Sequence, residues 1–230
     1  KKTHPDLSLT PRAAGTDMSG GDLNTSIIVS FMKYFNHTPK VHGQTATVEP
    51  GVYYRDLEEE TLKEHLLYPA YPSSREICAM GGVLNNNAGG EKSLEYGKTE
   101  KYVEELKVIL SDGNEYTLKP LNDKELQDKL TLNSFEGEIY RKIYKLVTQN
   151  YDILQKAKPN VSKNSAGYYL WNIYDKEARI FNLIKLFVGA QGTLGLVTQA
   201  KLKLVPVKKY SEMRIIFLNE LNHLGNIINA

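Results

Sequence analysis

The sequence predicts an α+β fold, in which an antiparallel β-sheet is flanked by helices. Residues 102–110 (YVEELKVIL) alternate between apolar and polar side chains, and residues 115–118 are also of β type. The intervening residues 111–114 (SDGN) form a turn signal, so a β-hairpin is expected. Two polar stretches, at about 123–129 and 136–157, carry apolar residues at helical spacing and are predicted to be surface helices covering a sheet.

The amino-terminal half predicts short strands, one helix and loops rich in glycine. Residues 7–11 and 27–31 are of β type and enclose a loop of small residues. Residues 45–49 form another expected strand, which a Pro-Gly pair ends, and residues 54–65 have helical spacing. Residues 81–90 (GGVLNNNAGG) contain too many glycines and asparagines for a helix interior, so an irregular segment is expected there.

The carboxy-terminal part predicts two further strands and the start of a helix. An apolar run at residues 186–188 leads into a third glycine-rich loop, residues 189–195 (GAQGTLG). Residues 197–205 alternate cleanly and predict a strand. Residues 212–218 (EMRIIFL) predict one more strand, and residues 220–229 predict a helix.

Composition excludes several classes of protein. The chain has 230 residues, of which 41% are hydrophobic and 24% are charged, so it is long and apolar enough for a buried core. Its net charge of +2 gives no reason to expect a nucleic-acid partner, and no apolar run approaches the roughly 20 residues of a transmembrane helix. Because the chain begins without Met and without a leader, we expect it to be part of a longer protein.

The cysteine and histidine content argues against a disulfide or a metal site. Cys78 is the single cysteine, and the five histidines show neither HxH nor HExxH spacing, so no metal site is expected. A reducing compartment, the cytoplasm, is the expected location. We expect Cys78 to be a small buried residue without a chemical role.

The three glycine-rich loops are candidates for binding a large anionic cofactor. Each lies beside a β-type run, and successive backbone N–H groups in turn conformations can form a nest for a phosphate. Neither GxGxxG nor GxxxxGK[ST] is present, which speaks against a Rossmann dinucleotide site and against a P-loop. A single loop of this kind is compatible with a plain tight turn.

The sequences of the loops resemble those of one family of flavoproteins. Residues 11–21 (PRAAGTDMSGG) resemble the pyrophosphate loop, usually PRGxGTSLSGG, of the vanillyl-alcohol oxidase / p-cresol methylhydroxylase type. Residues 69–90 followed by residues 93–99 are similar to that family's segment PPDPSS…TIGGMIANNAGG…RYG, and residues 192–198 (GTLGLVT) to its GTLGIIT segment. The branch of glycolate oxidase and of D-lactate and D-2-hydroxyglutarate dehydrogenases is most similar, since it also carries a segment like residues 163–170 (KNSAGYYL).

The resemblance implies a two-subdomain FAD-binding PCMH-type fold, with a small, partly parallel layer and a larger antiparallel sheet. Residues 1–206 would be the FAD-binding domain without its first part, and residues 207–230 the start of a truncated substrate or cap domain. The implied activity is FAD-linked oxidation of a D-2-hydroxy acid, such as lactate or glycolate, by hydride transfer to flavin N5, with a separate electron acceptor. The chain alone is expected to be inactive, and its exposed strand edge to favour self-association.

The resemblance also implies which residues bind the cofactor, while it assigns no catalytic residue. Backbone N–H groups and hydroxyls of the first loop would meet the two phosphate charges, and glycines of the second segment would offer a surface without side chains. The implied cofactor-binding residues are Arg12, Ala14, Gly15, Thr16, Ser19, Gly20, Pro72, Gly81, Gly82, Asn85, Asn86, Gly89, Tyr96, Gly97, Thr99, Gly192, Gly195 and Val197.

Three positions depart from the family pattern. Ala13 replaces a usual Gly, Asp17 replaces a usual Ser and Gln191 replaces a usual Glu, and the Asp17 carboxylate is expected to point away from the phosphates. No histidine and cysteine pair is available for a covalent flavin link, so FAD is expected to be non-covalent. Two alternatives remain: a related enzyme, such as an aldonolactone oxidase, an alkyl-glycerone-phosphate synthase or a UDP-N-acetylenolpyruvylglucosamine reductase, and a non-catalytic flavin-binding module.

Overall fold

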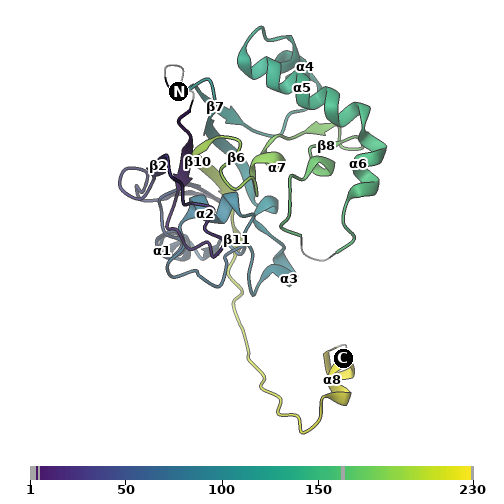
Figure 1. Cartoon of the computed structure of the whole chain (residues 1–230). Helices are drawn as coiled ribbons and strands as arrows, with labels where there is room; N and C mark the ends of the chain where they lie inside the picture. Colours follow the sequence, from purple (N-terminus) through teal and green to yellow (C-terminus); the bar gives the residue numbers. More distant parts are fainter. Residues whose placement is uncertain (1–3, 5, 162–163, 229–230) are drawn as a thin grey trace.

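A five-stranded antiparallel sheet forms the centre of the computed structural model, which describes His4 and residues 6–161 and 164–228 (Figure 1). The strand order is β3-β4-β10-β6-β7, and every neighbouring pair is antiparallel. The strands are β3 (Lys40–His42), β4 (Thr45–Val48), β10 (Leu196–Lys203), β6 (Val103–Ile109) and β7 (Glu115–Leu118). The predicted hairpin is therefore present as β6–β7, whereas the three-residue strand β3 is too short to be recognised from its alternation.

A separate two-stranded sheet carries the first glycine-rich loop. Strand β1 (Leu9–Arg12) pairs with β2 (Ile27–Ser30) in parallel, with Leu9 opposite Ile27 and Arg12 opposite Ser30. The loop between them turns the chain back to the start of β2, and Figure 1 shows this pair beside the larger sheet. The small parallel layer is thus confirmed, in agreement with the α+β class.

The predicted helices are present, with one break. Helix α1 (Tyr54–Lys63) follows the expected range, and α4 (Asp123–Thr131) begins with a capping box formed by Asn122 and Glu125. The helix predicted over residues 136–157 is in fact two helices, α5 (Phe135–Gln149) and α6 (Tyr151–Ala157). They separate at Asn150, whose backbone leaves the helical conformation and whose amide side chain donates to the Leu146 carbonyl.

The amphipathic face of α5 contacts a short hairpin. This hairpin consists of β8 (Tyr174–Asp175) and β9 (Ile180–Phe181). Tyr140 and Tyr144 of α5 place their rings about 6 Å from the ring of Phe181, at 6.1 and 5.9 Å between centroids. Figure 1 shows α4, α5 and α6 grouped at one end of the molecule.

The prediction of an irregular segment at residues 81–90 is wrong for its first half, because Met80–Asn85 form helix α2. Met80, Val83 and Leu84 are buried, so the apolar side of this turn of helix packs into the core. That burial outweighs the low helix propensity of Gly81 and Gly82. The shorter segments nearby are α3 (Ser93–Tyr96), η1 (Thr99–Lys101), η2 (Leu170–Asn172) and α7 (Ile184–Phe187).

The strand predicted at residues 212–218 is also wrong. The short strand β11 (Val205–Pro206) pairs with β5 (Leu66–Leu67), and beyond it the described chain is exposed. Residues 212–218 find no strand to pair with among the described residues, so their β-type sequence forms no strand. The predicted helix near the end is present as η3 (Leu221–His223) and α8 (Leu224–Ile228), and the last residue of the prediction, Asn229, lies outside the described residues (Figure 1).

Buried tyrosines hold the second motif segment against the sheet. The Tyr54 and Tyr71 ring centroids lie 5.0 Å apart, and those of Tyr68 and Tyr102 lie 5.8 Å apart. The Tyr68 hydroxyl donates to Thr99 Oγ1 at 2.9 Å. Cys78 is buried beside them, as predicted, and its burial raises the pKa of its thiol.

Candidate flavin-binding cleft

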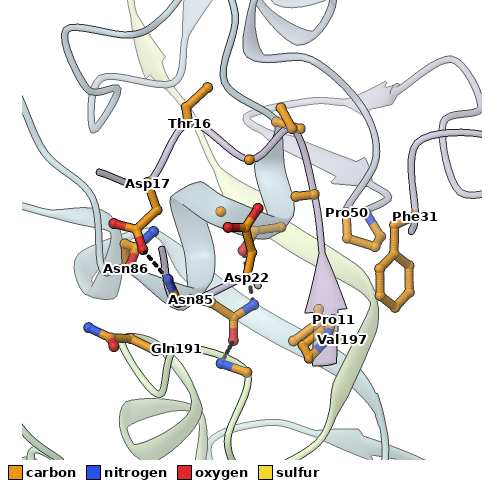
Figure 2. Close-up of a pocket in the computed structure, with 18 residues that line it drawn as sticks. Pro11, Thr16, Asp17, Asp22, Phe31, Pro50, Asn85, Asn86, Gln191 and Val197 are labelled. Carbon is orange, nitrogen blue, oxygen red and sulfur yellow. Dashed lines mark hydrogen bonds between the residues drawn. The ribbon is translucent and has the colours of Figure 1, made fainter. Parts of the chain in front are cut away.

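An open cleft of about 730 Å³ lies where the first loop, helix α2 and the turn before β10 meet (Figure 2). This volume includes open solvent at the mouth of the cleft. Its lining residues come from all three glycine-rich segments and from two flanking turns: Pro11, Ala13, Ala14, Gly15, Thr16, Asp17, Gly21, Asp22, Phe31, Pro50, Ala79, Gly81, Gly82, Asn85, Asn86, Gln191, Gly192 and Val197.

An ion pair behind the first loop sets its shape. Arg12 Nη1 lies 3.0 Å from Asp22 Oδ2, so the two ends of the loop are tied together. Gly15 has a φ of +69°, and a Cβ there would lie 2.5 Å from Arg12 Nη2. Only glycine fits this position without strain. Arg12, expected to bind the cofactor, therefore pairs with Asp22 and does not line the cleft.

Asp17 lines the cleft, although its carboxylate was expected to point away from it. Its oxygens accept from Ser19 N–H and Gly21 N–H, both at 3.2 Å, and from Ser19 Oγ at 2.5 Å. Figure 2 shows a dashed line that ends at the Asp17 carboxylate and marks one of these hydrogen bonds. The Ser19 hydroxyl and these N–H groups lower the pKa of Asp17, so the side chain is ionised at neutral pH.

The two glycines of α2 have different roles. A Cβ on Gly81 would lie 2.9 Å from Pro50 Cβ and 3.3 Å from Ala13 Cβ, so this glycine allows close packing of the fold. A Cβ on Gly82 would meet nothing within 4 Å, although Gly82 lines the cleft. The space in front of Gly82 is therefore open to a ligand, whereas the space in front of Gly81 is occupied by protein.

Asn85 joins helix α2 to the third loop. Its Nδ2 donates to the Gly81 carbonyl at 2.9 Å, and its Oδ1 accepts from Gly192 N–H at 3.1 Å. The N–H of Gln191 donates to the Asn85 carbonyl at 2.9 Å. Asn85 therefore positions the wall of the cleft, while the neighbouring Asn86 is exposed at its rim.

The third loop packs directly on the first motif. Gly192 has a φ of +74°, and a Cβ there would lie 2.4 Å from Pro11 Cγ. Val197, at the start of β10, is buried and forms part of the cleft floor. The first and third motifs, about 180 residues apart in the sequence, thus form adjoining parts of one site.

Half of the predicted site residues line the cleft. Those that do are Ala14, Gly15, Thr16, Gly81, Gly82, Asn85, Asn86, Gly192 and Val197. Those that do not are Arg12, Ser19, Gly20, Pro72, Gly89, Tyr96, Gly97, Thr99 and Gly195. Several of the second group have structural roles, since Thr99 Oγ1 donates to the Ala88 carbonyl and a Cβ on Gly195 would lie 2.7 Å from the Ile109 carbonyl oxygen.

The remaining lining residues were not predicted to bind the cofactor. Three of them, Ala13, Asp17 and Gln191, were recognised only as departures from the family pattern. Pro11 and Gly21 lie within the first motif, and Asp22 directly follows it. Phe31, Pro50 and Ala79 carry no signal in a single sequence, because nothing distinguishes them from core residues.

A polar cluster joins Lys98, in the second motif segment, to residues 164–170. Lys98 is buried, and its Nζ donates to the Asn164 carbonyl, to Ser165 Oγ and to Tyr169 Oη. Tyr168 Oη lies 2.6 Å from Thr193 Oγ1, so the same segment also contacts the third loop. Residues 164–170 of the KNSAGYYL segment therefore adjoin two of the three motifs, while its first residue, Lys163, lies outside the described residues.

Comparison with known proteins identifies the class. A family model described as an FAD binding domain matches residues 3–119, just over half of the chain. The chain belongs to this family, and its cofactor is FAD. The resemblance predicted from the three motifs is thus confirmed.

The most similar curated relatives include oxidoreductases of hydroxy acids. D-2-hydroxyglutarate dehydrogenase of Pseudomonas putida is 30% identical over 208 residues, which are 89% of this chain and 20% of that protein. Glycolate oxidase subunit GlcD of Bacillus subtilis is 32% identical over 203 residues, which are 87% of this chain and 32% of that protein. The chain thus spans between a fifth and a third of the length of these relatives.

A solved structure confirms the fold. Alkyldihydroxyacetonephosphate synthase superposes with a TM-score of 0.56 at 20% identity, covering 89% of this chain and 28% of that one. The small parallel sheet and the larger antiparallel sheet are those of an FAD-binding PCMH-type domain. Among the described residues, no helix is both long and apolar enough to cross a membrane, and no three potential ligand side chains gather at a metal site.

Proposed function

We propose that this domain binds FAD in the cleft and belongs to an enzyme that oxidises a D-2-hydroxy acid. The observation that carries the proposal is the open space in front of Gly82, on a wall built from the backbone of three family motifs. When bound, FAD supplies the acceptor for a hydride from the substrate at flavin N5. The protein contributes the orientation of the cofactor and the exclusion of water around it.

The first loop is proposed to hold the diphosphate. The N–H groups of Gly15 and Thr16 donate to no partner among the described residues, and both residues line the cleft. Such N–H groups bind phosphate oxygens without a lysine. We propose cofactor contact for the nine predicted residues that line the cleft. Eight of the other nine, from Arg12 to Gly195, are proposed to shape the loops, as the ion pair of Arg12 does. The ninth, Ser19, donates its N–H to Asp17, and this N–H is proposed to be available to the diphosphate once Asp17 moves away.

The substrate class follows from the names of the relatives. The curated relatives are named for D-2-hydroxyglutarate, glycolate and D-lactate, and each of these acids carries a hydroxyl next to a carboxylate. We therefore propose a D-2-hydroxy acid as the substrate and a separate electron acceptor as the second reactant. Location in the cytoplasm and a domain boundary between residues 206 and 207 complete the proposal; the boundary is supported by the exposure of the chain beyond β11.

Non-covalent binding of FAD is supported by the lining of the cleft. Among the described residues that line it, none is a cysteine or a histidine, and Cys78 is buried elsewhere. Acid precipitation of the flavin-loaded protein is expected to release yellow cofactor into the supernatant. Flavin that stays with the pellet would contradict this part of the proposal.

A pair of neighbouring glycines tests the site. Gly82→Ala adds a methyl group into space that the protein leaves open and favours the helix, so stability is expected to hold or rise by up to about 1 kcal/mol. The same methyl group would meet the cofactor, so the Kd for FAD is expected to rise at least about tenfold. Flavin fluorescence titration and thermal unfolding measure the two effects.

Two further alanine variants control this experiment. Gly81→Ala is expected to lower stability, because its Cβ would lie 2.9 Å from Pro50 Cβ. Gly225→Ala adds a methyl group to open space in helix α8, away from the cleft, so it is expected to favour its helix as Gly82→Ala does while leaving the Kd for FAD unchanged. An unchanged FAD affinity in Gly82→Ala would show that the cofactor does not lie against α2.

Self-association through β1 is proposed as well. Strand β1 pairs with β2 on one side only among the described residues, so its other edge is open to pairing with another chain. The Ser8 and Arg12 carbonyls accept from the β2 side, so the N–H of Leu9, which alternates with them, faces the open edge. Sedimentation velocity over a range of concentrations should show oligomers that Leu9→Pro suppresses, because proline removes this backbone donor from the edge. A monomer at all concentrations would refute this proposal.

A further inference from the structure

The carboxylate of Asp17 occupies a phosphate-like position within the first loop. It lies between the N–H groups of Ser19 and Gly21 and accepts from both, as well as from the Ser19 hydroxyl. Three donors converging on one anionic group are what a turn-shaped nest offers to a phosphate. The loop therefore already holds an anion, and that anion is one of its own side chains.

The two carboxylates of the loop differ in their charge balance. Asp22 is neutralised by Arg12, at 3.0 Å. Asp17 forms no ion pair with a cation among the described residues, and its hydrogen bonds keep it ionised. None of the described residues lining the cleft is Lys, Arg or His, so the negative charge of Asp17 is not offset inside the cleft. A diphosphate entering the cleft would thus meet an uncompensated like charge.

We infer that Asp17 is an internal competitor of the cofactor, whose carboxylate must give up the Ser19 and Gly21 N–H groups before the diphosphate can use them. This inference rests on the proposed function, since it concerns the same cleft. Asp17 thereby sets the affinity of the loop for FAD, because the diphosphate has to displace its carboxylate. In the cofactor-free protein, the same carboxylate keeps the loop in an ordered shape. The usual Ser of the family at this position would neither repel the phosphates nor fill the nest.

Two substitutions of Asp17 separate the effect of its negative charge from the effect of its hydrogen bonds to the loop N–H groups. Asp17→Asn keeps an oxygen that can accept from the same N–H groups but removes the charge. Asp17→Ser removes the charge and also the carboxylate oxygens that accept from these N–H groups. We expect the Kd for FAD to fall about tenfold or more in Asp17→Ser and by a smaller factor in Asp17→Asn, measured by flavin fluorescence in the 230-residue chain.

Asp112→Asn is a matched control. Asp112 also caps its own turn, accepting from Asn114 N–H at 3.1 Å and from the Tyr116 hydroxyl at 2.5 Å. Its pKa is likewise lowered by its hydrogen bonds to Tyr116 and Asn114, although burial opposes them. It lies in the β6–β7 hairpin and not on the cleft. Asp112→Asn is expected to leave FAD binding unchanged, so an effect confined to Asp17 cannot come from the loss of a turn cap alone.

A second ligand distinguishes failure of this inference from failure of the proposed function. Inorganic pyrophosphate is titrated while the amide resonances of Ser19 and Gly21 are followed by NMR, and these are expected to shift at lower concentration in Asp17→Ser than in the wild type. If FAD binds to the wild type and to both Asp17 variants with one affinity, the inference is overturned and the proposed function stands. If no variant binds FAD but pyrophosphate shows the expected difference, the inference stands and the proposed function fails. If neither ligand distinguishes Asp17→Ser from the wild type, the inference is overturned.

Discussion

The two walls of the cleft differ in how they are supported. The wall formed by α2 and β10 stands on the five-stranded sheet, where Leu106 and Leu202 are at most 1% exposed. The wall formed by the first loop stands on the parallel pair β1–β2, where Leu9 and Ile27 are 48% and 43% exposed. Parallel strands are usually covered on both faces. The residues proposed to meet the diphosphate are therefore carried by the less stable support.

This difference teaches that stability and cofactor affinity are governed by separate parts of the molecule. Packing of the sheet determines whether the domain folds, because most buried apolar residues belong to its cluster. Order in the first loop determines how well N–H groups are presented to a ligand. Substitutions on the two sides should consequently affect different measurements.

The largest expected effect comes from truncation in the sheet. Leu106→Ala, in the central strand β6, is expected to lower the free energy of unfolding by about 2 to 5 kcal/mol, because the side chain is fully packed. Ile28→Ala, in β2, is expected to cost less than about 1 kcal/mol, because Ile28 is exposed. Urea unfolding followed by circular dichroism measures both, and equal losses would remove the distinction between the two walls.

High pH should destabilise the folded domain, and two of the tyrosines responsible lie on the sheet side. Burial raises the pKa of Tyr54 and of Tyr68 far above 10, so in the folded state both stay neutral while the unfolded chain ionises. The unfolded state then holds fewer protons, and stability falls as pH rises above about 10, by roughly 1.4 kcal/mol per pH unit for each tyrosine. Tyr68→Phe should make the measured slope less steep, and an unchanged slope in this variant would count against the assignment.

The wall formed by α2 and β10 can itself be weakened at one asparagine. Asn85→Ala removes the bonds to the Gly81 carbonyl and the Gly192 N–H and is expected to cost about 1 to 3 kcal/mol of stability. It should also weaken FAD binding, because the third loop loses its position. Asn86→Ala is the control, since Asn86 is exposed at the rim, and should change stability by less than about 0.5 kcal/mol. Equal stability of the two variants in thermal unfolding would show that the Asn85 side chain does not hold α2 and the third loop together.

The smallest effect is expected far from both walls, in α5. The hydroxyl of Tyr140 is buried without a hydrogen-bond partner among the described residues. Tyr140→Phe removes this unsatisfied group and is expected to raise the free energy of unfolding by about 1 kcal/mol while leaving FAD binding unchanged. A loss of stability on urea unfolding would reveal a partner for the hydroxyl.

Local signals made much of the fold predictable. The β6–β7 hairpin follows from the SDGN turn between two β-type runs, and α4 begins at a capping box that can be read from Asn122 and Glu125. The sequences of the three motifs predicted the family and its cofactor FAD, and the comparisons confirm both. These features depend on residues a few positions apart, so a single sequence contains the necessary information.

Other features depended on contacts between distant segments. Helix α2 forms in spite of two glycines because Met80, Val83 and Leu84 are buried, and residues 212–218 form no strand because no described strand lies beside them. The sequence assigned Asn85 and Asn86 the same role, whereas only the Asn85 side chain reaches Gly192, more than a hundred positions away. No local pattern contains such a contact.

By itself, the sequence determined the class of fold, the family and its cofactor, because turn residues, alternation and glycine-rich wording act locally. The tertiary structure alone decided which glycine faces open space, since Gly81 packs against Pro50 while Gly82, one residue later, faces the cleft. It also decided that Arg12 neutralises Asp22 and that Asp17 fills the nest of its own loop. The physical reason is that steric space and charge balance are sums over all neighbours in three dimensions, and most of those neighbours are distant in the chain.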